Sequence, residues 1–529
     1  MKKLFAELVI CFAFVGLGFG QIRVGDEIDT TAIRKIWNEG TQNSEVMELA
    51  QYLTEVCGPR LTGSPQYMKA ARWTMLKMSA WGLSNVHLEA WGPFGRSWSL
   101  KDYSATVTEP DVFPLFSFPK AWSPSTKGNV EGDVVYFDAQ TDSALATFRG
   151  KLKGAFVLMG EPRALRPEFE PRATRREDTL LLSMANSDMP SPRGRRRFTA
   201  GPEDKARGLV EYKKLKLALD EGAHAILTSN RGDAGNIFVQ QASAIIHPDT
   251  PMARRPRVWD AKASKFLPQV AVSTEHYNRL ARLVQRNLRV RLEMNLDVAY
   301  HRADSAHNVI AEIAGTDLAD EVVMIGAHLD SWHGGTGATD NATGVAACLE
   351  AVRILQRLGL KPRRTIRVGL WSGEEQGIYG SEAYVRQHFG QRSADSLRTI
   401  ALKPAAEKFS AYFNDDNGAG RFRGVYMQGN EAVRPIFRRW LTAIGDPSAQ
   451  TLTLMNTGST DHVPFDQVGL PAFQFIQDNL EYNTLTHHST MDVYDRLVPE
   501  DLQQSAIIMA IFAYNAAMRD EKLPRKPAR

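Results

Sequence analysis

The sequence predicts an α/β protein in which a mixed, mostly parallel sheet is flanked by helices and carries an inserted β-rich domain. Two patterns of apolar residues along the chain support this prediction. After residue 300, strand-like apolar runs alternate with helical periodicity, whereas residues 130–297 show short β-type runs separated by turn residues. The chain has 529 residues, 43% of them hydrophobic, so two to three domains with their own cores are expected.

The N-terminal residues have the pattern of a secretory signal peptide. Two lysines follow the first methionine, an apolar run extends from Leu8 to Phe19, and Gly18 and Gly20 frame a cleavage site. The run is shorter than the roughly 20 apolar residues that a membrane-spanning helix requires. We therefore expect a cleaved signal over 1–20, a secreted or periplasmic protein, and no transmembrane segment in the mature chain. An uncleaved anchor or a buried helix is the alternative.

Residues 21–129 are predicted to form the first part of the main domain. Between 44 and 82, apolar residues recur at helical spacing in two runs. A loop rich in Gly and Pro, 57–65, separates the runs, so we expect two helices joined by a turn.

Residues 130–297 are predicted to form a compact β-rich domain inserted in the main one. Short β-type runs alternate with turns, and one helix is expected over 209–219. Within this block, residues 163–207 hold ten Arg and five Pro with little periodicity. We interpret 163–207 as an Arg- and Pro-rich surface loop or disordered insertion.

Residues 298–529 complete the main domain with alternating strands and helices. A clear helix is expected over 342–358. Strand-like runs lie at 321–327, 365–371, 410–413 and 470–476. This succession is typical of a largely parallel sheet, in which functional residues gather beyond the carboxyl ends of the strands.

Histidines and carboxylates follow strand after strand in this region. They are His328 and Asp330, Asp340, Glu374 and Glu375, Asp415 and Asp416, and His487 and His488. Repulsion among so many carboxylates at one sheet edge is costly unless cations neutralise it. Imidazoles with carboxylates suit zinc, and five ligands exceed what one catalytic zinc takes from protein. The residues therefore predict two metal ions that share a bridging carboxylate.

Composition excludes other classes of function. The three cysteines, Cys11, Cys57 and Cys348, are too few for a disulfide scaffold and contain no Cys-x-x-Cys pair for a thiolate metal site. With 64 basic and 60 acidic residues the net charge is +4, so neither nucleic acid nor an anionic membrane is expected as a partner.

Five motifs together make the chain resemble the co-catalytic zinc exopeptidases of the M28 family. They are Gly-Ala-His-Leu-Asp-Ser-Trp at 326–332, Asp-Asn-Ala-Thr-Gly at 340–344, Trp-Ser-Gly-Glu-Glu-Gln-Gly at 371–377, Asn-Asp-Asp at 414–416 and His-His-Ser at 487–489. Each motif alone is weak, whereas the combination is specific and spans most of the mature chain. The resemblance implies a zinc-exopeptidase fold with a peptidase domain over 21–129 and 298–529, and a protease-associated (PA) domain inserted at 130–297.

The resemblance also implies a set of metal ligands. One zinc ion is expected to be bound by His328 and Asp416. The second is expected to be bound by Glu375 and His488, with Asp340 bridging the two ions.

Three further features follow from the resemblance. Glu374 is expected to be the general base that takes a proton from the attacking water and passes it to the leaving amine. Asp330 is expected to hold the imidazole of His328 by its other nitrogen. The peptide bond between Asp340 and Asn341 is expected to be cis.

Two ligand assignments leave a neighbouring residue as an alternative. Asp415 competes with Asp416 and His487 with His488, and the motif positions favour Asp416 and His488. The family often has a tyrosine just before the ligand histidine, where it binds the tetrahedral oxyanion. His487 occupies that position here, so the resemblance supplies no oxyanion-binding tyrosine.

The resemblance implies an exopeptidase with two Zn²⁺ ions that acts on peptides or dipeptides. An aminopeptidase is favoured, and a dipeptidase-type carboxypeptidase is the alternative, because the two share this metal core. A non-catalytic receptor-like ectodomain is disfavoured because all five ligands and Glu374 are present, and the complete ligand set also argues against a one-zinc, glutaminyl-cyclase-like transferase. A homodimer is a further expectation from the family.

Overall fold

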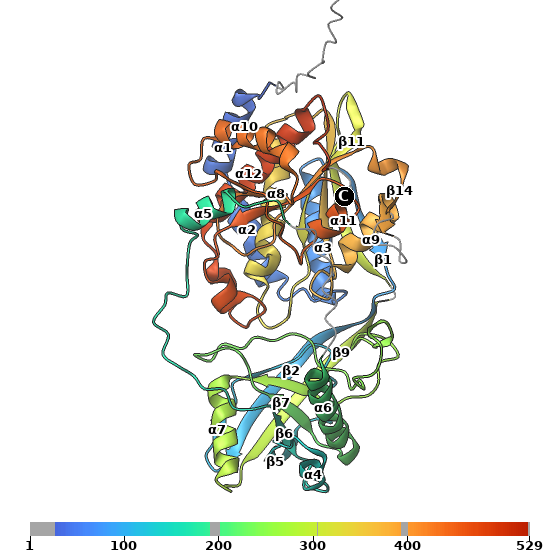
Figure 1. The fold of residues 1–529 in the computed structure, drawn as a ribbon, viewed down its shortest axis with the longest axis vertical. Helices are drawn as coiled ribbons and strands as arrows, with labels where there is room; N and C mark the ends of the chain where they lie inside the picture. Colours follow the sequence, from blue (N-terminus) through green and yellow to red (C-terminus); the bar gives the residue numbers. More distant parts are fainter. Residues whose placement is uncertain (1–26, 191–200, 304, 393–399, 527–529) are drawn as a thin grey trace, which may run out of the picture.

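The computed structural model describes residues 27–190, 201–303, 305–392 and 400–526. They form two eight-stranded mixed sheets, each with its own helices (Figure 1). The predicted signal peptide lies outside the described residues. Within the described ranges, no helix combines the length and the apolar composition needed to cross a membrane.

The first sheet confirms the predicted α/β class. In spatial order its strands are β1 (Ser84–Trp91), β10 (Ala306–Ile313), β12 (Arg364–Trp371), β11 (Leu318–His328), β15 (Phe409–Asn414), β18 (Ala472–Gln477), β16 (Phe422–Tyr426) and β17 (Thr451–Thr453). The four central strands, β12, β11, β15 and β18, are parallel to one another, whereas the β1–β10, β10–β12 and β16–β18 pairs are antiparallel. Their carboxyl ends therefore meet at one edge.

Helices cover both faces of this sheet. On β11, Val323 and Ile325 pack into the large core that contains α8 and α12, whereas Val322 and Met324 face the smaller core of α9 and α11. This alternation is what a buried strand requires. The helices are α1 (Thr30–Gln42), α2 (Val46–Gln51), α3 (Pro65–Ala80), α8 (Thr343–Arg357), α9 (Tyr379–His388), α10 (Arg434–Ile444), α11 (His462–Gln467) and α12 (Pro499–Met518).

The predicted helix pair near the N-terminus is present. The helix α2 continues into the one-turn π-helix η1 (Tyr52–Val56), and α3 starts where Ser64 accepts a hydrogen bond from the backbone N–H of Tyr67 over 3.1 Å. Pro65 at the first helical position has the φ angle that a helix needs. Short elements complete this half: η3 (Ala338–Ala342), β13 (Gly390–Arg392), β14 (Ile400–Leu402), η4 (Pro404–Ala406), η5 (Glu431–Val433), η6 (Tyr482–Thr486) and η7 (Tyr494–Arg496).

The second sheet occupies the lower half of Figure 1. In spatial order its strands are β3 (Phe113–Pro114), β2 (Gly95–Glu109), β9 (Arg291–Ala303), β5 (Val130–Tyr136), β6 (Phe156–Met159), β7 (Ala225–Thr228), β8 (Gln269–Val272) and β4 (Ser117–Pro119). Its helices are α4 (Asp142–Ala146), α6 (Pro202–Glu221), η2 (Met252–Arg254) and α7 (Thr274–Gln285). The strands thus start at residue 95, ahead of 130. The domain boundaries and the PA assignment stay predictions.

Residues 163–207 are more structured than the predicted loop. They contain helix α5 (Asp178–Ala185) and the start of α6, and α5 lies beside the first sheet rather than the second (Figure 1). The guanidinium of Arg175 binds the buried carboxylates of Asp478 and Asp501 over 2.9 and 2.7 Å. We call the parts of the molecule built on the first and second sheets its first and second halves. Arg175 therefore anchors this segment to the first half, through partners that lie far away in the sequence.

Candidate metal centre

The predicted site residues gather at the carboxyl ends of the central strands. His328 is the last residue of β11, and the other residues lie in the loops that follow β11, β12, β15 and β18. Because these strands are parallel, every loop opens at the same edge. The residues brought together are His328, Asp330, Asp340, Glu374, Glu375, Asp416 and His488.

His328, Asp340 and Asp416 form one half of the cluster. Nε2 of His328 lies 3.2 Å from Oδ1 of Asp340 and 3.3 Å from Oδ1 of Asp416. On the other side of the ring, Nδ1 lies 2.9 Å from the backbone oxygen of Asp330. A proton on Nδ1 donates to that oxygen, which leaves the Nε2 lone pair for a cation.

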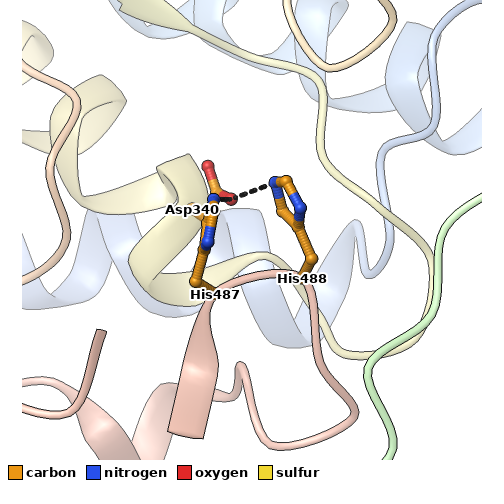
Figure 2. A group of neighbouring side chains, drawn as sticks. All are labelled: Asp340, His487 and His488. Atoms are coloured by element: carbon orange, nitrogen blue, oxygen red, sulfur yellow. Dashed lines mark ion pairs between the residues drawn. The ribbon is translucent and has the colours of Figure 1, made fainter. Parts of the chain in front are cut away.

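His488, Asp340 and Glu375 form the other half. Nε2 of His488 lies 3.1 Å from Oδ2 of Asp340 and 3.0 Å from Oε2 of Glu375. Figure 2 shows the carboxylate of Asp340 and the two adjacent histidines turned toward one another. The two oxygens of Asp340 thus face two different histidines, as a bridging carboxylate must. The peptide bond that follows Asp340 is cis, as expected.

Asp330 acts differently from the prediction. Its carboxylate lies 3.8 Å from Nδ1 of His328, so the backbone oxygen, rather than the side chain, holds the imidazole. The carboxylate instead accepts hydrogen bonds from the hydroxyl of Thr62 over 2.9 Å and from the backbone N–H groups of Glu374 and Glu375, each over 3.3 Å. Asp330 therefore fixes the turn that carries the two glutamates.

Burial and charge shift the acid–base properties of the cluster. Burial raises the pKa of Glu374 well above its ordinary value, and burial with the charge of Asp340 raises the pKa of Glu375 to about 7. Burial lowers the pKa of His488, but Glu375 and Asp340 outweigh this effect and raise it to about 10. In the metal-free site, protons therefore neutralise negative charge that bound divalent cations would neutralise in their place.

The geometry favours the predicted member of each ambiguous pair. Asp416 contacts His328, whereas Oδ1 of the buried Asp415 has no hydrogen-bond partner among the described residues. Nε2 of His487 lies 3.7 Å from Oδ2 of Asp340, farther than the 3.1 Å of His488. The rings of His487 and His488 lie close together, with 3.7 Å between their centroids.

Two further residues support the cluster, and sequence reasoning missed Gln240. The amide nitrogen of Gln240, from the second half of the molecule, lies 3.0 Å from Nδ1 of His488. The buried Asp461 forms a short hydrogen bond with Ser381, and its charge is among those that raise the pKa of Glu374. No local pattern marks Gln240, whereas the Ser-Thr-Asp-His run at 459–462 was the available signal for Asp461.

The donor set fits two divalent cations. Donor atoms of His328, Asp340 and Asp416 lie within 4.8 Å of one another, and so do those of Asp340, His487 and His488. Imidazole nitrogens with carboxylate oxygens are the ligands that zinc takes in catalytic sites. Asp340 belongs to both groups, so the two positions adjoin.

Comparison with known proteins agrees with this geometry. Residues 308–513, which contain every predicted ligand, match the model of peptidase family M28. Over 488 residues the chain is 25% identical to carboxypeptidase Q of Mus musculus, and this match covers 92% of the chain and 88% of that protein.

Solved structures share the fold over both halves of the molecule. A peptidase M28 precursor from Shewanella amazonensis gives a TM-score of 0.63 at 22% identity, covering 94% of this chain and 99% of that one. A zinc aminopeptidase from Bacillus subtilis gives a TM-score of 0.51 at 18% identity, covering 90% and 95%. Residues 308–513, which hold the site, therefore belong to peptidase family M28 and indicate a metallo-exopeptidase.

Proposed function

We propose that the chain is a co-catalytic dizinc exopeptidase that releases residues from the amino termini of peptides. Asp340 carries this proposal, because one of its oxygens lies beside His328 and the other beside His488. A site for a single ion does not require one carboxylate shared between two donor groups. Two-metal hydrolases use such a carboxylate to hold their ions about 3.5–4 Å apart.

Five residues would hold the two zinc ions. His328 and Asp416 would bind one ion, His488 and Glu375 the other, and Asp340 both. When bound, the ions supply Lewis acidity that polarises the scissile carbonyl and acidifies water.

Glu374 is the group that moves the proton. Its residue is half-buried, and desolvation, reinforced by the charges of Asp416 and Glu375, keeps the pKa of its carboxyl well above the ordinary value. A carboxylate with a raised pKa accepts a proton from water and returns it to the leaving amine at near-neutral pH. Asp330 holds the backbone of Glu374 in place while this happens.

The charge of the cluster supports recognition of a free amino terminus. Six carboxyl groups lie in or beside the cluster, whereas two zinc ions carry four positive charges. Burial raises the pKa of Asp330, Glu374 and Asp461, so the carboxylates that stay ionised beside the bound ions, rather than all six, would attract the ammonium group of a substrate. The six are Asp330, Asp340, Glu374, Glu375, Asp416 and Asp461.

A dipeptidase-type carboxypeptidase is the second candidate, and Arg231 favours it. The guanidinium of Arg231 lies 4.1 Å from the ring centroid of Phe238 and donates to the backbone oxygen of His487 over 3.4 Å, beside the cluster. No acidic side chain among the described residues forms an ion pair with it. Arginine binds free carboxylates well, so Arg231 would suit a substrate carboxyl terminus.

Blocked peptides distinguish the two candidates. An aminopeptidase cleaves aminoacyl anilides and C-amidated dipeptides but not N-acetylated ones, whereas a carboxypeptidase cleaves N-acetylated dipeptides and rejects amidated ones. For a carboxypeptidase, Arg231→Met would raise KM for substrates with a free carboxylate. Activity that survives both chelation and Glu374→Gln would exclude either form of the proposal.

We also propose that the protein is exported, on the basis of the signal-like pattern over residues 1–20. The test is N-terminal sequencing of the protein recovered from the periplasm or the medium. A new terminus near Gln21 would support export, and recovery of the intact chain from the cytoplasm would contradict it.

A further inference from the structure

We propose that the second half of the molecule supplies a positioning residue for the metal centre: Gln240 fixes the ring of His488, and residues 236–240 hold its loop. We call residues 236–240 the clamp. The inference rests on the proposed dizinc function, because it concerns the half of the cluster formed by His488 and Glu375. It gives the second half of the molecule a part in binding metal.

The clamp and the His488 loop lie alongside each other as a short antiparallel pair. The backbone N–H of Val239 donates to the oxygen of His488 over 2.9 Å, and the N–H of Thr490 donates to the oxygen of Ile237 over 2.8 Å. An antiparallel bridge between 238 and 489 lies between these two bonds. The backbone of the ligand is therefore paired with a segment of the other half.

Side chains reinforce this pairing. The amide of Asn236, whose residue is 4% exposed, donates to the backbone oxygen of Leu485 over 2.9 Å. Asn230 stiffens the clamp from its own side, because its amide donates to the oxygen of Phe238 over 2.9 Å and its carbonyl accepts from the N–H of the same residue over 3.2 Å. The clamp thus presents a preorganised edge to the ligand loop.

Gln240 reaches the imidazole itself. Its side-chain nitrogen lies 3.0 Å from Nδ1 of His488, on the opposite side of the ring from the nitrogen that faces Asp340 and Glu375. A histidine that binds metal through Nε2 carries its proton on Nδ1 and needs an acceptor there. A half-turn of the amide places Oε1 of Gln240 at the same position, because the two ends of an amide are interchangeable in shape.

The two ligand histidines are held by different halves of the molecule. His328 is 1% exposed at its side chain and is anchored by the backbone of Asp330, within its own half. His488 is 18% exposed and has a left-handed backbone with φ of 61°, which a residue with a side chain rarely adopts. The clamp supplies the contacts that hold this conformation.

The test compares Gln240→Met with the wild-type protein. Methionine keeps the length of the side chain but offers no amide, and Gln240 is exposed, so the core is not disturbed. Zinc dissociation constants are measured by competition with chelators of graded strength. We expect one of the two constants, that of the position held by His488, to rise about 10–100-fold, the usual effect of removing such a partner, and the other to stay unchanged.

Two further variants complete the design. Gln240→Glu keeps an acceptor for Nδ1–H and should restore zinc affinity to the wild-type value or better. Gln241→Met alters the exposed neighbour, which pairs with Ala121 only through its backbone bridge, and should leave both constants unchanged.

Three results would overturn the inference. Equal affinities in Gln240→Met and wild type would contradict it, and so would an equal loss at both sites together with a lower melting temperature of the metal-free protein. A wild-type chain that binds one zinc ion would instead reject the dizinc function itself, and the inference with it. The wild-type titration therefore separates failure of the function from failure of the inference.

Discussion

The carboxylate of Asp330 accepts a hydrogen bond from the backbone N–H of Glu374, with 3.3 Å between the nitrogen and Oδ1. Its other oxygen accepts from Glu375 and from the hydroxyl of Thr62. One buried side chain thus joins the first segment of the chain to the turn that carries a proposed base and a proposed ligand. In the proposed mechanism, the side chain of Asp330 orients the glutamates, while its backbone oxygen orients His328.

Asp330→Asn should lower kcat/KM about 10–100-fold with the zinc content unchanged. The amide places a donor where the carboxylate accepted hydrogen bonds, so the Glu374 turn loses a partner. Activity and zinc content are measured on the same preparation, with the exposed Asp138→Asn as the control. A parallel loss of zinc would show that Asp330 acts on the ions instead.

Glu374→Gln should lower kcat by about 10²–10⁴-fold, the range for loss of a general base. The amide has nearly the same shape but takes no proton from water. Both zinc ions should remain, because the proposed ligand is Glu375. A kcat equal to that of the wild type in this variant would show that Glu374 is not the general base.

Zinc affinity should rise with pH. In the metal-free protein, carboxylates raise the pKa of His488 to about 10 and that of His328 well above its ordinary value, although burial opposes both shifts. Both rings therefore hold protons at pH 7, and zinc must displace them, so acid weakens binding. Calorimetry in buffers with different ionisation enthalpies measures the protons released. Binding without proton release would show that the histidines are not ligands.

Arg175→Met should destabilise the protein by about 1–2 kcal/mol. This is less than the roughly 3–5 kcal/mol for a buried ion pair that loses one partner. The reason is that Asp478 still forms its ion pair with Arg423, and Asp501 with Arg421. Arg175 is also 44% exposed, which weakens its pairs. Urea unfolding gives the free energy, and proteolysis within 163–190 should accelerate. The exposed Arg166→Met is the control, and equal cleavage of both variants would contradict the docking.

Much of the fold and of the candidate site follows from local sequence. His328 and Asp416 stand at the ends of apolar runs, and the carboxyl ends of parallel strands meet at one edge, so their proximity was predictable. The order of residues within each motif also favoured Asp416 over Asp415.

The remaining features depend on contacts that no local pattern reports. The docking of Arg175 requires Asp478 and Asp501, which lie roughly 300 positions away, so the composition of 163–207 alone suggested a solvated loop. Gln240 contacts His488 only because the two halves of the molecule pack together. Whether His328 contacts the backbone oxygen or the carboxylate of Asp330 depends on ångström-scale placement of the turn after β12.

Anomalous diffraction from crystals of the zinc-loaded protein, recorded at the zinc edge, tests the central claim most directly. We predict two peaks about 3.5–4 Å apart, one on each side of the Asp340 carboxylate, between His328 and His488. A single peak at full zinc occupancy, or two peaks that do not share Asp340, would contradict the dizinc account.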